Sequence, residues 1–131
     1  MAASPTPAAP DPVAAPFDPD RLRALGCAHS GCEREVTLEL LLSLPWLMQE
    51  VTRAVVLRDA VHLATHAREL RRCCRTLGAV PLASACAPLE HMGERGDFRG
   101  ARLQLEQTQR EHARLQRALA DHLTELRSRA A

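Results

Sequence analysis

Residues 58–81, RDAVHLATHARELRRCCRTLGAVP, decide the fold that this sequence predicts. Apolar residues recur in this stretch every three or four positions, which is the spacing of one buried face of a helix. These positions are Leu63, Ala67, Leu70, Cys74 and Leu77. Asp59 can cap the start of the helix, and Gly78 can end it. The stretch therefore predicts an amphipathic helix from about Asp59 to Leu77.

Two further helices are predicted before this one. Asp18 is an N-cap residue followed by a proline at the first helical position, so a short helix is expected over residues 19–25, ending at Gly26. Ser30 and Glu33 have the spacing of a capping box, in which a serine caps the helix and a glutamate three residues later caps it in return. A second helix is therefore expected to begin at Ser30.

This second helix is expected to run to about Leu57 and to be irregular in the middle. Its apolar positions again follow helical spacing. They are Val36, Leu40, Leu44, Leu47 and Val51. Pro45 lies inside the pattern, and a proline lacks the N–H that the helix ladder needs. A kink or a local break is therefore expected near Leu44.

Two helices are predicted after residue 78. Pro81 opens one that ends near Gly93 and bends at Pro88, with Leu82, Leu89 and Met92 facing inward. A longer helix follows from Phe98 to about Arg127. Its inward positions are Leu105, His112, Leu115, Leu119 and Leu123. Four longer helices with short connections predict an all-α fold, an antiparallel up-down four-helix bundle with a short N-terminal helix.

Composition supports this class and divides the chain into two parts. Aromatic residues make up only 2% of the chain, so leucine and alanine, which favour helices, must fill the core. Residues 1–16 contain five prolines and are expected to form a disordered tail. Residues 17–131 are expected to form the bundle.

Charge and cysteine usage point to a protein of the cytoplasm. The net charge of +1 gives no argument for nucleic acid or membrane binding. No apolar run approaches the roughly 20 residues that span a bilayer, and the N-terminus lacks the pattern of a secretory signal. Five cysteines without regular spacing are a poor disulfide framework, so reduced thiols are expected.

Two polar stripes flank the apolar face of the predicted helix over residues 59–77. One stripe contains His62, His66, Glu69 and Cys73. The other contains Thr65, Arg68, Arg72 and Arg75, with Arg71 beside it. These arginines repel one another, so one interpretation is a surface that binds an acidic partner or a phosphoryl group. The alternative is a solvated face, partly neutralised by nearby acidic residues, in a chain that contains many arginines and no lysine.

The sequence contains no pattern that argues for an enzyme, a cofactor or a metal. His62 and His66 have a spacing that can share a metal ion, and Cys73 follows two turns later. There is no HExxH motif and no positioned third ligand, so surface residues are the better interpretation. No nucleophile–base pair, glycine-rich phosphate loop or pair of carboxylates can be argued.

The chain from Phe17 to about Leu123 resembles the histidine-containing phosphotransfer (HPt) domain of bacterial phosphorelays. FDPDRLRALG resembles the opening helix of that family, residues 58–79 its central helix, and PLASACAPLEHMGERGDFRGAR the segment that follows. The flanks fix the register without an insertion. The residues in register are Leu77, Gly78, Ala79, Leu82, Cys86, Leu89, Glu90, Gly96 and Asp97.

In this register the resemblance implies that the phosphotransfer site is degenerate. Ala67 and Leu70 match the family, but Arg68 stands where the phosphoryl-accepting histidine is expected, and Arg71 replaces a lysine. Arg72 replaces the glycine that lets a receiver domain approach closely. A guanidinium stays protonated and cannot act as the nucleophile that phosphotransfer needs.

The resemblance implies a non-phosphorylatable HPt-like protein that binds a receiver domain or a histidine kinase through Thr65, Arg68, Arg71, Arg72 and Arg75. It would be a regulator or adaptor and a monomer or weak dimer. Two alternatives stay open. His66 or His62 could be a displaced phosphoryl acceptor, although His66 lies about 200° around the helix from Arg68. The chain could also be an unrelated helical adaptor for an acidic protein surface.

Overall fold

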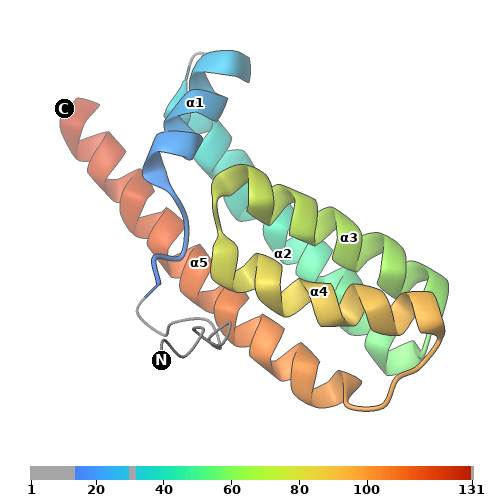
Figure 1. The fold of residues 1–131 in the computed structure, drawn as a ribbon. Helices are drawn as coiled ribbons and strands as arrows, with labels where there is room; N and C mark the ends of the chain where they lie inside the picture. Colours follow the sequence, from blue (N-terminus) through green and yellow to red (C-terminus); the bar gives the residue numbers. More distant parts are fainter. Residues whose placement is uncertain (1–13, 30–31, 131) are drawn as a thin grey trace, which may run out of the picture.

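The computed structural model describes residues 14–29 and 32–130, and these form five α-helices without a strand (Figure 1). The helices are α1 (Pro19–His29), α2 (Glu33–Leu57), α3 (Ala60–Leu77), α4 (Val80–Arg95) and α5 (Ala101–Ala130). The predicted all-α class is confirmed. Most of the expected disordered tail, residues 1–13, lies outside the described residues.

The four longer helices form an antiparallel up-down bundle. The α2–α3 and α3–α4 connections have two residues each, so each helix reverses the direction of the one before it (Figure 1). Helices α2 and α4 both pack against α3 and against α5, which closes the ring of four. Helix α1 lies at one end of the bundle, where it contacts α2 and α3.

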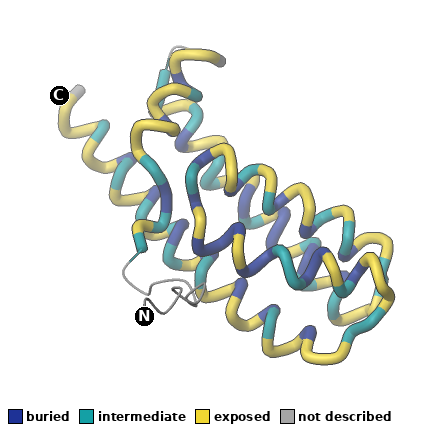
Figure 2. The backbone as a smooth tube through the Cα atoms, viewed as in Figure 1, coloured by how far each residue is buried: buried dark blue, intermediate teal, exposed yellow. Residues whose placement is uncertain are grey.

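Leucine fills the core, as the lack of aromatic residues requires. Every helix contributes at least one leucine that is nearly inaccessible to solvent, and the buried positions line the inner sides of the helices (Figure 2). These leucines are Leu22, Leu44, Leu63, Leu70, Leu77, Leu82, Leu89, Leu115 and Leu119. All five apolar positions predicted for α3 are fully buried, which fixes the direction of its polar stripes.

Helices α3 and α4 come unusually close at Gly93. A Cβ atom on Gly93 would lie 2.5 Å from the backbone nitrogen of Ala64 and 2.9 Å from the carbonyl oxygen of Ala60. Only glycine fits there without a shift of the backbone. This contact brings the α4 side chains that precede Gly93 against the stripe of α3 that contains the arginines.

The predicted boundary between the first two helices is wrong. Helix α1 continues through Gly26 to His29, because Gly26 serves a close contact rather than a helix end: its Cβ would lie 2.7 Å from the Cα of Glu33. Helix α2 has Cys32 at its N-cap position, without a side-chain cap hydrogen bond, and Glu33 is its first residue. Glu33 therefore does not occupy the third position of a capping box, and Ser30 lies outside the described residues.

The predicted break near Leu44 is also wrong. Helix α2 is uninterrupted at Pro45, and Leu44 is fully buried, so core packing holds the helix together across the missing N–H. Helix α4 likewise continues through Pro88 and past Gly93 to Arg95, where Gly96 takes the left-handed conformation at its C-cap. Helix α5 begins at Ala101 rather than Phe98, after a turn, and extends to Ala130.

Among the helices that the structure describes, α2 alone is long and apolar enough to cross a membrane, with a mean hydropathy of 1.3 over its best window. The expectation that no apolar run approaches the length of a membrane span is therefore wrong, as judged by length and composition alone. The core helix of a water-soluble protein passes the same test, so a single such helix is weak evidence for a membrane span.

Candidate functional site

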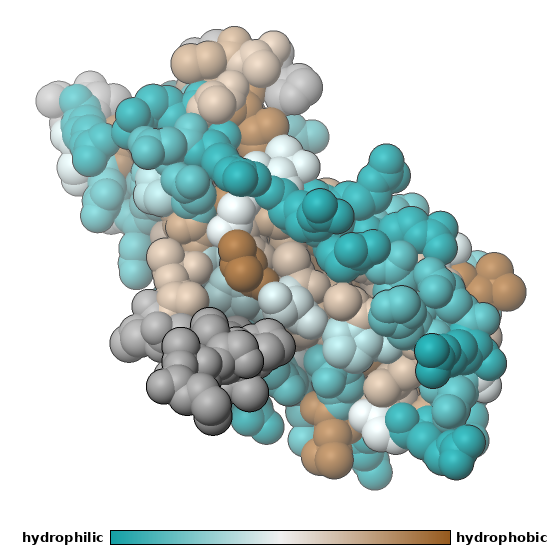
Figure 3. Space-filling view, viewed as in Figure 1, coloured by the Kyte–Doolittle hydropathy of each residue, from teal (hydrophilic) through white to brown (hydrophobic). Residues whose placement is uncertain are grey.

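The arginine stripe, which consists of Thr65, Arg68, Arg72 and Arg75 with Arg71 beside it, lies on the outer side of α3. The two caps of α3 define where the helix begins and ends. The Asp59 side chain accepts a hydrogen bond of 3.1 Å from the backbone N–H of His62, and Gly78 closes the other end with φ 68°. This bond and the His62 side chain hold the pKa of Asp59 below its ordinary value. Thr65 and Arg72 are exposed on this side, and hydrophilic side chains form a band over α3 (Figure 3).

Two of the four arginines converge on a buried carboxylate of α4. The Nε of Arg71 donates to Glu90 Oε2 at 2.6 Å, and the Nε of Arg68 donates to Glu90 Oε1 at 3.2 Å. A second nitrogen of Arg68 lies 3.5 Å from the carboxylate of Glu94. These four residues are termed the Glu90 cluster. The Glu90 side chain is only 9% exposed, whereas Arg68 and Glu94 are 50% and 43% exposed, so the cluster joins a buried carboxylate to arginines at the surface.

The two arginines keep Glu90 ionised. Burial alone would raise the pKa of its carboxyl group, but the hydrogen bonds and positive charges of Arg71 and Arg68 outweigh burial, so the pKa lies below its ordinary value. Arg68 is 50% exposed and Arg71 30% exposed. Both cations therefore still reach solvent on the side away from Glu90.

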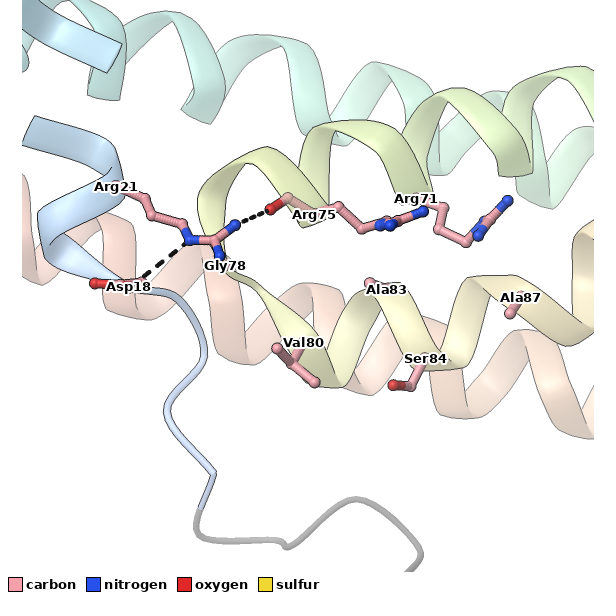
Figure 4. A pocket seen from close by; sticks show the side chains of 9 residues that line it. All are labelled: Asp18, Arg21, Arg71, Arg75, Gly78, Val80, Ala83, Ser84 and Ala87. Atoms are coloured by element: carbon pink, nitrogen blue, oxygen red, sulfur yellow. Dashed lines mark hydrogen bonds and ion pairs between the residues drawn. The ribbon is translucent and has the colours of Figure 1, made fainter. Parts of the chain in front are cut away.

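An open groove of about 580 Å³ lies beside the cluster, between α3, α4 and the start of α1 (Figure 4). Arg71 and Arg75 form one wall, and the small side chains of Ala83, Ser84 and Ala87 form the other. The Arg75 side chain extends along α3 toward Arg71 (Figure 4). This groove can accept an anionic or hydrogen-bonding group between the arginines of α3 and the small side chains of α4.

Asp18, just before α1, and Arg21 of α1 line the far end of this groove. Arg21 donates from Nη1 to the backbone carbonyl of Arg75 at 2.8 Å, and its Nε lies 3.8 Å from the carboxylate of Asp18 (Figure 4). The backbone N–H of Asp18 also donates to the carbonyl of Leu77. Helix α1 is thus tied to the C-terminal end of α3. Within the described part of the chain, no ion pair involves the side chains of Arg72 or Arg75.

The two histidines lie on a different side of α3 from the arginines. The His66 side chain is 14% exposed, stacks edge-on against Trp46 of α2 with ring centroids 5.9 Å apart, and lies 3.8 Å from the carboxylate of Glu50. The His62 side chain is 64% exposed and lies 2.6 Å from the carboxylate of Asp59. Of the two predicted alternative acceptors, only His62 is open to a partner.

The other polar stripe of α3 contains His62, His66, Glu69 and Cys73. Across residues 14–29 and 32–130, no group of three His, Cys, Asp or Glu side chains is arranged to hold a metal ion. Cys73 is half-buried, and burial raises the pKa of its thiol.

Glu90 is the site residue that sequence reasoning missed. The sequence placed it in register with the HPt family but gave it no role. A signal was present: Glu90 follows Cys86 by four residues and precedes Gly93 by three, so it continues the buried row of α4. A carboxylate in such a row needs a cation, and the arginine-rich helix that precedes α4 supplies two.

Comparison with solved structures identifies one similar fold. The crystal structure of histidine-containing phosphotransfer protein B from Pseudomonas aeruginosa PAO1 matches with a TM-score of 0.77 and 23% sequence identity, over 86% of this chain and 97% of that chain. No family model and no curated protein matches the sequence. At this identity the likeness shows the fold alone: the chain is a helical bundle with the architecture of an HPt protein.

Proposed function

We propose that this chain is an HPt-like protein of a two-component phosphorelay that binds a receiver domain or a histidine kinase without carrying the phosphoryl group itself. One observation supports the proposal: Arg68, which the resemblance puts in register with the phosphoryl-accepting histidine, donates its Nε to buried Glu90. A scaffold of HPt architecture thus has a structural ion pair at the position where the chemistry of an HPt domain is expected.

The chemistry of Arg68 excludes phosphoryl transfer at that position. Transfer from an aspartyl phosphate needs a nitrogen lone pair as the nucleophile. A guanidinium is permanently protonated, and the Nε of Arg68 is a donor to Glu90. The exposed Arg72 adds a long side chain where the family has glycine. This surface supports docking and does not support transfer.

The partner that fits this surface is the acidic pocket of a receiver domain. Arg72 and Arg75 carry guanidinium groups without an ion pair in the described part of the chain, and Arg71 and Arg75 line the groove. Thr65 lies on the same exposed side of α3. Charge complementarity of this kind raises the association rate and makes binding sensitive to salt. The protein would act in the cytoplasm and compete with an active relay protein for the same receiver.

Binding and label transfer test the proposal together. The probes are purified receiver domains and kinases from the same organism, with the receivers carrying a radiolabelled phosphoryl group. We expect the wild type to bind at least one probe and to take up no acid-labile label. Reversal of Arg72 and Arg75 to glutamate should weaken binding by about tenfold or more. The control, Arg102→Glu, changes an exposed arginine of α5 and should leave binding intact.

A gain-of-function variant tests the register. Arg68→His combined with Arg72→Gly replaces the two departures that block transfer and keeps the charge of Arg71, and the double variant should accept label from a receiver that binds the wild type. Acid-labile label on the wild type that His62→Gln removes would instead show an active carrier with a displaced histidine. If no receiver or kinase binds, while an acidic protein of another class does, the chain is an unrelated adaptor.

A further inference from the structure

One side of α2 is exposed along its whole length and carries large apolar side chains. Residues that lie within about 60° of Leu42 around the helix, at 3.6 residues per turn, share this side. With the half-buried Pro45, they are Glu35, Leu38, Glu39, Leu42, Trp46, Gln49, Arg53, Val56 and Leu57, and this set is termed the α2 outer face. Leu42 is 78% exposed, and more than half of Trp46 is exposed.

The packing of the described helices leaves most of this face uncovered. Helix α2 contacts α1, α3 and α5. Trp46 of the outer face also touches α3, where its ring packs edge-on against His66, but it stays 54% exposed. Only 28% of the most apolar 18-residue window of α2 is buried. Five of the 18 residues of α3 are buried, which is a similar share, so α2 differs in that its exposed side carries large apolar residues. Contiguous apolar surface of this kind marks a site of association.

The charges on the α2 outer face are arranged with opposite signs at its two ends. Glu35 and Glu39 flank the leucines in the first half of α2, and Arg53 lies in the second half. Within the residues that the structure describes, none of the three forms an ion pair. The face therefore offers an acidic end and a basic end, both without a partner in their own chain.

We propose that the α2 outer face binds the same face of a second copy of this chain, with the two α2 helices antiparallel about a two-fold axis. An axis midway between Leu42 and Trp46 places Leu42 against Trp46 of the second copy. The same axis places Glu35 against Arg53 of the second copy, twice, by symmetry. A parallel pairing would instead bring Glu35 against Glu35 and Arg53 against Arg53.

This occupant fits the face better than a membrane does. Helices that lie on lipid surfaces carry arginine or lysine beside their apolar side chains. Here the exposed leucines are flanked by Glu35 and Glu39, which anionic lipids repel. The face supplies its own complement in charge and pairs Leu42 with Trp46, as a two-fold interface requires. The proposal does not rest on a role in a phosphorelay.

Sedimentation equilibrium from low micromolar to millimolar protein tests the dimer. The wild type should show a reversible monomer–dimer equilibrium, and Leu42→Arg should be monomeric throughout. Leu103→Arg is the matched control, because Leu103 is an equally exposed leucine on α5 (74% exposed) and should leave the equilibrium unchanged. Trp46 is the sole tryptophan of the chain, so its emission should shift to the blue as the concentration rises.

Charge reversal tests the antiparallel register. Glu35→Arg alone and Arg53→Glu alone each place like charges together in both symmetric pairs, and each should weaken self-association by about tenfold or more. An equimolar mixture of the two variants restores opposite charges in both pairs, so it should form heterodimers at least as tight as the wild-type dimer.

Several results would overturn the proposal. A wild type that stays monomeric at millimolar concentration excludes it, whether or not the protein binds lipid vesicles. Equal loss of the dimer in Leu103→Arg and Leu42→Arg places the interface elsewhere. A mixture of the charge variants that fails to associate refutes the antiparallel register.

Discussion

Replacement of Glu90 by glutamine should lower the free energy of unfolding by about 2 kcal/mol at pH 7. The substitution keeps the size of the side chain and removes only its charge. Glu90 accepts hydrogen bonds of 2.6 Å from Arg71 and 3.2 Å from Arg68. Hydrogen bonds to charged groups contribute about 1.5–3 kcal/mol each. The amide oxygen of glutamine can keep one of the two bonds, now to a neutral acceptor.

The exposure of the arginines limits the loss. Removal of one partner from a fully buried ion pair costs about 3–5 kcal/mol, because the other charge is left without solvent. Here Arg68 and Arg71 are 50% and 30% exposed, so water can hydrate both once Glu90 is neutral. The expected loss of about 2 kcal/mol corresponds to a decrease in Tm of about 6–10 °C for a chain of this length.

Urea unfolding followed by circular dichroism measures this difference, and its pH dependence identifies the cause. The pKa of Glu90 in the folded state lies below the ordinary value of 4.5. The ionised carboxylate therefore stabilises the fold fully above that value, and the contribution is lost as the pH falls through the folded-state pKa. The gap between wild type and Glu90→Gln should be constant from pH 7 to about pH 5 and should close below pH 4.5.

Glu94→Gln is the matched control, because Glu94 is a more exposed carboxylate that lies 3.5 Å from the same Arg68. An exposed pair of this kind contributes at most about 1 kcal/mol, so the control should stay within about 0.5 kcal/mol of the wild type. A Glu90→Gln variant as stable as the wild type at pH 7 would refute the reasoning, as would a gap that does not change with pH.

One further substitution and one labelling experiment test the packing of the bundle. Gly93→Ala should destabilise the bundle by about 1–3 kcal/mol, since the new methyl group meets the backbone of Ala64, and thermal unfolding measures the loss. A Tm at or above that of the wild type would show that the helices can separate freely. Thiol labelling at pH 8 should modify exposed Cys27 rapidly and spare Cys74 and Cys86 until the protein unfolds, because burial raises the pKa of Cys86 to about 12 and that of Cys74 well above its ordinary value. Fast labelling of either buried thiol in the native protein would contradict the described core.

Helix α3 is predictable because every local signal in it agrees. The cap at Asp59, the end at Gly78 and the apolar spacing between them all point to the same helix, and the structure confirms each one. The region around Gly26 behaves differently. Gly26 predicts a helix end, yet tertiary contact with Glu33 decides its role and lets α1 continue. A glycine selected for close approach cannot be told from a terminator in a single sequence.

The candidate site shows the same division between local and tertiary information. Helical spacing predicts that Thr65, Arg68 and Arg72 share one side of α3, because that property depends on the helix alone. The Glu90 cluster depends on the distance between α3 and α4, which Gly93 sets and no sequence period encodes. The α2 outer face was missed for a related reason. The spacing of α2 identifies its buried side, but it does not reveal that large apolar residues on the opposite side stay uncovered.

The geometry of the Glu90 cluster also makes the gain-of-function test interpretable. Arg71, not Arg68, forms the shorter hydrogen bond to Glu90, and Arg71 stays in place in the Arg68→His, Arg72→Gly variant. Loss of the longer bond from a half-exposed arginine should cost about 1 kcal/mol, and a glycine inside α3 should cost about 1 kcal/mol more. A bundle with a fully buried leucine core tolerates a loss of this size. Circular dichroism of the double variant should therefore show a folded helical protein with a lower Tm. If that folded protein still took up no label from a receiver that it binds, the register that places Arg68 at the phosphoryl-acceptor position would be wrong, and the docking surface would need another explanation.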